Sequence, residues 1–183
     1  MLIPNFHPFP ELSTERLILR RITNKDVDDL FILRSDERLM RYIDRPLAQT
    51  SEDALQLIQK IHDAWATNDG ITWGISLKTD LKLIGTIGYW RIVKEHYRAE
   101  IGYLISLEQQ GKGLMQEAMD IILGYGFNEL QLHSIEANVN PANAASVKLL
   151  ERNNFIKEAH FKENYFFNGV FHDTFIYSLI NPF

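Results

Sequence analysis

The chain of 183 residues contains no cysteine, which excludes disulfide bonds, cysteine metal sites and a thiol nucleophile. It has no run of about 20 apolar residues, the length that a membrane-spanning helix needs, and its start lacks the pattern of a signal peptide. Its six histidines have no paired spacing, so no metal site is expected. The net charge of −5 argues against a nucleic-acid binder, which carries a basic surface. A cytoplasmic protein without nucleic-acid or membrane partners is expected.

The composition that remains is ordinary for a globular protein, with 45% hydrophobic and 23% charged residues. At this length a single domain over residues 1–183 is expected, because no linker or internal repeat divides the chain. Prolines interrupt the opening segment, which is expected to lie extended on the surface. Alternating apolar residues predict strands at 17–22, 71–77, 82–93, 97–106, 132–139, 155–166 and 171–179. Helical spacing and caps predict helices near 24–34, 50–65, 114–125 and 143–152.

The stretch from Glu100 to Asn128 joins a predicted strand to a predicted helix through two glycines, Gly111 and Gly113. A helix that starts in this way leaves several backbone N–H groups without intrahelical partners, all pointing in one direction. With the positive end of the helix dipole, these donors suit a phosphate or pyrophosphate. An ordinary helix after a glycine turn fits the same pattern. The Lys-Ser/Thr of a P-loop and the third glycine of a dinucleotide site are both missing.

The residues around these glycines resemble a known family. The segment QGKGLM, preceded by AEIGYLIS, resembles the acetyl-CoA-binding segment of the GCN5-related N-acetyltransferases (GNAT). Met115 stands where glycine or alanine is usual, and methionine there is familiar in the ribosomal-protein N-acetyltransferase branch. Nearer the C-terminus, NPANAASVKLLERNNF is typical of the family and FNGVFHD of the same branch. The resemblance spans about residues 14–179.

This resemblance implies an α/β (α+β) GNAT fold, with a mixed central sheet of about six to seven strands splayed at its centre and flanked by about four helices. It implies acetyl-CoA as co-substrate and an amine as acceptor, and it is compatible with a homodimer. A bulge near Tyr103-Leu104 is expected to open the sheet and free backbone groups for the pantetheine arm. The family pattern assigns acetyl-CoA binding to residues on the strands, the glycine turn and the next helices, namely Tyr103, Leu104, Ile105, Gln110, Gly111, Lys112, Gly113, Leu114, Met115, Asn138, Asn143 and Ser146.

Acetyl transfer to an amine needs an unprotonated nucleophile, a polarised carbonyl and a proton for the departing thiolate. Because the chain has no cysteine, direct attack of the amine is expected rather than an acyl-enzyme. Glu100 is the expected base, since the family often has a carboxylate there; a purely structural glutamate is the alternative. Ser146 or Tyr165 is expected to protonate the thiolate, although Ser146 also fits a helix-surface hydroxyl and Tyr165 a groove wall. Asn143 also fits a plain helix cap.

The expected function is therefore transfer of acetyl to an N-terminal α-amine of a protein or peptide, as in the ribosomal-protein branch. An α-amine has a pKa of about 8 and a lysine about 10.4, so the α-amine needs less help from a base at pH 7. Acetylation of a small amine, such as an amino acid, a polyamine or an antibiotic, remains an alternative. A CoA-binding sensor without catalysis and a nucleotide-binding module are two further alternatives.

Overall fold

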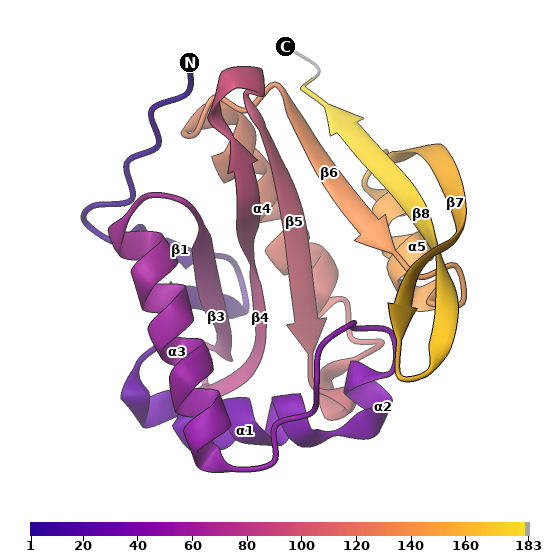
Figure 1. The fold of residues 1–183 in the computed structure, drawn as a ribbon. Helices are drawn as coiled ribbons and strands as arrows, with labels where there is room; N and C mark the ends of the chain where they lie inside the picture. Colours follow the sequence, from indigo (N-terminus) through magenta and orange to yellow (C-terminus); the bar gives the residue numbers. More distant parts are fainter. Residues whose placement is uncertain (182–183) are drawn as a thin grey trace.

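The computed structural model describes residues 1–181, whose strands form one sheet in the order β1-β2-β3-β4-β5-β6-β8-β7 (Figure 1). The strands are β1 (Leu12–Ser13), β2 (Leu17–Arg21), β3 (Ile71–Leu77), β4 (Asp80–Val93), β5 (Arg98–Ile105), β6 (Ser134–Val139), β7 (Ile156–Phe167) and β8 (Val170–Ile180). The α-helices are α1 (Val27–Ser35), α2 (Glu37–Met40), α3 (Ser51–Ala66), α4 (Leu114–Asn128) and α5 (Ala144–Arg152).

The expected α/β class with a mixed sheet is confirmed. The described residues form eight strands and five α-helices, one strand and one helix more than expected. The two extra elements are β1, with two residues, and α2, with four. Elements of this length are too short to show a hydrophobic period, which is why the sequence did not predict them.

The sheet opens between β5 and β6, its only parallel pair of neighbouring strands among the described residues. Their ladder has three residue pairs and ends where Glu100 lies opposite Glu136. Beyond that point β5 stays paired with β4 as far as Ile105. The predicted splay is therefore confirmed, but the β-bulge expected near Tyr103-Leu104 is wrong, because both residues keep a regular register with β4. The opening arises because the parallel pairing stops, leaving one edge of β5 without a strand.

Helices cover both faces of the sheet (Figure 1). On one face, α1 and α3 lie over β4 and β3. The sequence favours capping boxes at Thr23 and Thr50; the first begins the 3-10 turn Asn24–Asp26 that leads into α1, and the second begins α3. On the opposite face, α4 packs against β2 and β4 in the larger apolar cluster, which includes Trp73 and Tyr89. The site therefore opens between two helical layers whose positions are fixed by separate cores.

The opening segment does not lie on the surface as expected. Phe6 is fully buried and belongs to the larger apolar cluster. Its carbonyl accepts a 2.8 Å hydrogen bond from the Trp65 indole, and its amide donates one of 2.8 Å to the Asn68 side chain. These partners lie about 60 residues away in sequence, so no local sequence pattern predicts these contacts.

Gly126 of α4 packs against a buried tyrosine ring. A Cβ at this position would lie 2.4 Å from the Tyr89 hydroxyl oxygen, which donates a 2.7 Å hydrogen bond to the Ile122 carbonyl. We expect Gly126→Ala to lower the free energy of unfolding by about 1–3 kcal/mol, because the ring must shift within a filled core. Gly124→Ala, with open space at the same helix, should raise it by up to about 1 kcal/mol. Urea unfolding of both variants checks this, and equal midpoints would contradict it.

Candidate active site

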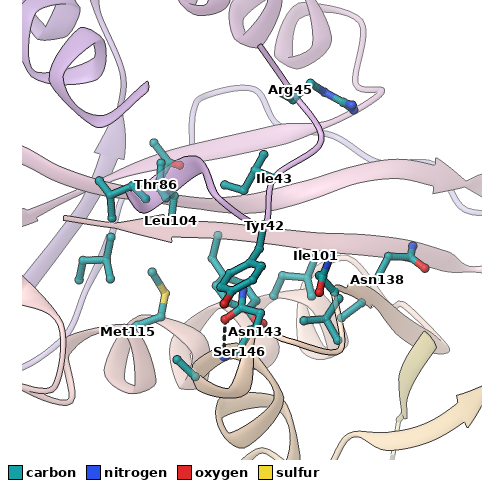
Figure 2. Close-up of a pocket in the computed structure, with 18 of the residues that line it drawn as sticks. Tyr42, Ile43, Arg45, Thr86, Ile101, Leu104, Met115, Asn138, Asn143 and Ser146 are labelled. Carbon is teal, nitrogen blue, oxygen red and sulfur yellow. Dashed lines mark hydrogen bonds between the residues drawn. The ribbon is translucent and has the colours of Figure 1, made fainter. Parts of the chain in front are cut away.

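A cavity of about 1380 Å³ is lined from both faces of the sheet at the opening between β5 and β6. Figure 2 shows Tyr42 and Ile43 reaching from the loop before α3 toward the strands, with Met115, Asn143 and Ser146 across the strands from that loop. The first pair belongs to the layer of α1 and α3, and the other three belong to the layer of α4 and α5. The cavity thus has two sides, which we call the loop side and the α4 side.

The α4 side contains the glycine turn. Gly111 and Gly113 have φ values of +73° and +76°, a left-handed conformation that side chains with a Cβ rarely adopt. Gly113 precedes the first residue of α4, and the backbone amides from Gly111 to Gln116 donate to no other group among residues 1–181. These donors at a helix N-terminus fit the diphosphate of a CoA molecule. We call residues 110–115 the cradle.

A salt bridge that the sequence did not reveal supports the cradle. Arg16 donates a 3.0 Å hydrogen bond to the Lys112 carbonyl and one of 2.6 Å to the Glu117 carboxylate. Glu117 also accepts from the Arg16 amide at 2.8 Å and from the Thr14 hydroxyl. Burial opposes ionisation of Glu117, but these hydrogen bonds hold its pKa below the ordinary value. The only sequence signal was the TER segment before the first predicted strand, which gives no indication of a contact about 100 residues away.

Two hydroxyl groups meet where α5 approaches β5. The Tyr103 hydroxyl oxygen lies 2.5 Å from Ser146 Oγ, and burial raises the pKa of Tyr103 to about 12. Tyr103 is therefore neutral at physiological pH and able to donate to Ser146. Asn143 accepts a 3.2 Å hydrogen bond from the Ser146 amide, which confirms the interpretation of Asn143 as a helix cap.

Glu100 is buried at the last rung of the parallel ladder, with 6% of its surface exposed. Burial raises its pKa; the neighbouring Glu136 adds to this, while Asn138 and Arg91 oppose it. The Arg91 guanidinium lies 3.2 Å from Glu100 Oε2, and the Asn138 amide donates a 3.1 Å hydrogen bond to Glu136. A carboxylate whose pKa is raised is a stronger base than an ordinary glutamate, and its place in a cavity makes it suited to accept a proton from a substrate.

The loop side has an aromatic wall. Trp90, which faces Glu100 across the β4–β5 ladder, is 37% exposed and lines the cavity. Its indole nitrogen would lie 3.6 Å from a Cβ at Gly102. Tyr42 and Arg45 complete this side, and sequence reasoning missed both because their loop has no hydrophobic period.

The structure brings nearly all predicted site residues to this one cavity. Lys112 is the exception, since its ammonium group donates to the Gln109 side chain at 3.1 Å and it does not line the cavity. Tyr165 lines the cavity from β7, with its ring stacked on His172. The other predicted residues that line it are Glu100, Tyr103, Leu104, Ile105, Gln110, Gly111, Gly113, Leu114, Met115, Asn138, Asn143 and Ser146. Their individual roles stay predictions.

Fold and cavity together define the class of protein: an acetyltransferase of the GNAT family, to which the chain belongs because residues 16–156 match the model described as "Acetyltransferase (GNAT) domain". Enzymes of this family take their acetyl group from acetyl-CoA, which is therefore the co-substrate here. The chain is an N-acetyltransferase. Within residues 1–181, no helix is long and apolar enough to span a bilayer, and no group of three or more metal-ligating side chains is present.

Individual relatives carry more specific names. The chain is 37% identical to the uncharacterised N-acetyltransferase YoaA of Bacillus subtilis, over 95% of this chain and 98% of that protein. It is 27% identical to the ribosomal protein uS5-alanine N-acetyltransferase of Escherichia coli, over 96% and 93% of the two chains. The structure of spermidine N-acetyltransferase from Vibrio cholerae in complex with CoA and spermine matches with a TM-score of 0.81 and 26% identity, covering 91% of this chain and 96% of that one.

Proposed function

We propose that this N-acetyltransferase acts as one domain and modifies the N-terminal α-amine of a protein or peptide in the cytoplasm. The observation that carries the proposal is the buried Glu100, placed in the same cavity as the cradle. Likeness over nearly the full length to the Escherichia coli enzyme named for a ribosomal protein supports the choice of acceptor. A small amine is the second candidate, supported by the likeness to spermidine N-acetyltransferase.

The proposed mechanism uses groups at the opening of the sheet. The thioester of acetyl-CoA supplies an electrophilic carbon and a thiolate leaving group. Glu100 removes a proton from the acceptor ammonium group, directly or through water, so that the neutral amine attacks the carbonyl carbon. Among residues 1–181, no strand pairs with the edge of β5 that faces the opening beyond Glu100, so its backbone is available to the donor. The attack leaves a protonated nitrogen on the tetrahedral intermediate. As the carbon–sulfur bond breaks, Ser146 gives its hydroxyl proton to the sulfur and takes one from that nitrogen, so that the amide, the CoA thiol and a neutral serine result.

A panel of acceptors tests this proposal. Peptides that begin with alanine or serine should be acetylated, whereas the same peptides with a blocked N-terminus and an internal lysine should not. Faster turnover of spermidine than of every peptide would favour the second candidate. Unfolding scans with CoA, ATP and NAD separate the remaining alternatives, because only CoA should stabilise the protein. Stabilisation by CoA without turnover of any amine would overturn the enzymatic proposal in favour of a sensor.

The hydroxyl pair gives a second test, because Tyr103 should act only through Ser146. If Tyr103 donates to Ser146 Oγ, the serine proton is free to point at the sulfur. We expect Ser146→Ala to lower kcat about tenfold. The loss is modest because the thiol has a pKa of about 8.5, so its thiolate is already a fair leaving group. Tyr103→Phe should cost about three- to tenfold, which corresponds to one hydrogen bond.

A double-mutant cycle separates this interpretation from a structural one. In the Ser146→Ala background, Tyr103→Phe should change kcat by less than about twofold, because the group through which it acts is already gone. Multiplicative losses in the double variant would show that Tyr103 acts independently of Ser146. An unchanged kcat for Ser146→Ala would instead remove Ser146 from the mechanism.

A further inference from the structure

The loop side of the cavity has an arginine without a counter-ion. Most charged side chains there form an ion pair or hydrogen bonds with the backbone. The Arg45 guanidinium lies 3.2 Å from the Asp44 carboxylate. The Asp53 carboxylate accepts hydrogen bonds from the backbone amides of Gln49 and Thr50, just before α3. Arg34, at the end of α1, lines the same cavity, and its side chain makes no hydrogen bond or ion pair with any of residues 1–181.

The environment of Arg34 is unfavourable for a lone cation. Its side chain is half-buried, and burial together with the nearby Arg45 lowers its pKa below the ordinary value. An arginine nevertheless stays charged at every physiological pH, so it cannot relieve this cost by losing a proton. An incoming anion would relieve it, and the planar guanidinium matches the two oxygens of a carboxylate or phosphate.

The position of this charge relates it to the acceptor. Glu100, the proposed base, faces Trp90 across the β4–β5 ladder. The Arg45 guanidinium carbon lies 5.7 Å from the centroid of the Trp90 ring, and Arg45 and Arg34 line the same cavity. Arg91 is paired with Glu100 itself, so Arg45 is a further positive charge, placed beyond the Trp90 ring from the carboxylate that receives the amine. Figure 2 shows Arg45 across the strands from Met115, and Arg34 belongs to α1, so neither arginine is part of the cradle.

We propose that Arg34, assisted by Arg45, binds an anionic group of the acceptor, so that the preferred substrate is a primary amine that also carries a carboxylate or phosphate. The inference rests on the proposed function and narrows its acceptor. A peptide with an acidic residue close to its N-terminus meets the requirement, and so does the α-carboxylate of a free amino acid. A polyamine has only positive charge beyond its reacting amine, and the same arginines repel it.

Matched acceptors test the inference. Wild-type kcat/KM should be at least about tenfold higher for a peptide beginning Ser-Glu than for the same peptide beginning Ser-Gln, as expected for a charge-assisted hydrogen bond. A free amino acid and its amide form the second pair. A preference within the peptide pair places the anion on a side chain, and one within the amino-acid pair places it on the α-carboxylate; either supports the inference.

Two variants assign the effect to Arg34. Arg34→Met keeps an apolar stem and removes the charge, so kcat/KM for the acidic acceptor should fall to the value for its neutral partner, while the neutral acceptor is unaffected. Arg38→Met is the matched control. Arg38 also lines the cavity but pairs with Asp36 at 2.7 Å, so the preference should persist in this variant. Retained stabilisation by CoA shows that both variants are folded.

Three results would overturn the inference. They are equal kcat/KM for acidic and neutral partners in the wild type, a preference that survives Arg34→Met, and spermidine as a better acceptor than the acidic amines. Each leaves an active N-acetyltransferase, so the failure is confined to the anion site. Absence of turnover with every amine would overturn the proposed function as well.

Discussion

Glu100→Gln is expected to lower kcat/KM by about 100-fold or more, because it removes the group that accepts the proton from the amine. The variant keeps the size of the side chain and the buried position at the end of the β5–β6 ladder. Steady-state kinetics with the best peptide of the panel measures the loss. Glu95→Gln, an exposed position, is the matched control and should retain wild-type kinetics.

The pH dependence gives Glu100 a second signature. Burial raises its pKa, so wild-type kcat/KM should fall as pH decreases through a value above the ordinary glutamate pKa of 4.5. Titration of the acceptor amine also contributes to this fall. The comparison of wild type with Glu100→Gln isolates the glutamate, since the variant should lose only that part of the profile.

Stability distinguishes a base from a structural glutamate. A carboxyl group whose pKa is raised in the folded state stabilises the fold most below its unfolded pKa, and this contribution is lost as pH rises through the folded pKa. At pH 7 the wild type therefore carries the cost of a buried charge that glutamine does not. Glu100→Gln should unfold at the same temperature as the wild type or higher, with a smaller difference at pH 4. Lower stability with retained activity would show that Glu100 is structural.

Gly113→Val is expected to abolish most of the stabilisation by CoA. Valine is strongly disfavoured at a φ of +76°, and its Cβ would lie 3.6 Å from the guanidinium of Arg16, which supports the cradle. CoA at 100 times its dissociation constant should stabilise the wild type by about 2.7 kcal/mol. If the variant binds about 100-fold more weakly, the same concentration gives only about 0.4 kcal/mol.

The control for this experiment is a glycine inside α4, away from the cradle. Gly124→Ala, in the helix that follows the cradle, should keep the full response to CoA. Thermal unfolding with and without CoA measures the stabilisation of both variants by CoA. A Gly113→Val protein that responds to CoA like the wild type would show that the donor binds elsewhere.

The sequence predicted the parts of the site that depend on local patterns. The turn at Gly111 and Gly113 and the cap at Asn143 follow from a few neighbouring residues, and the structure shows both. Arg34 and Tyr42 were not found, because their place in the cavity depends on how α1 and the next loop pack on the sheet. The burial of Phe6 was missed for the same reason, since it depends on α3 and the turn after it.

The predicted bulge failed for a different physical reason. Sequence alternation describes one strand at a time, whereas the end of a ladder depends on where two strands diverge. Nothing in the residues after Glu100 marks the point at which β6 leaves β5.

The short parallel ladder also has a mechanical consequence. Within residues 1–181, three residue pairs alone link β1–β5 to β6–β8 in the sheet, and the larger apolar cluster provides the rest of the connection between the two parts. The cavity is lined by residues of both parts, so we expect a bound donor to contact both and to restrict their relative motion. We therefore expect the protein to be more flexible at this opening after product release than with the donor bound.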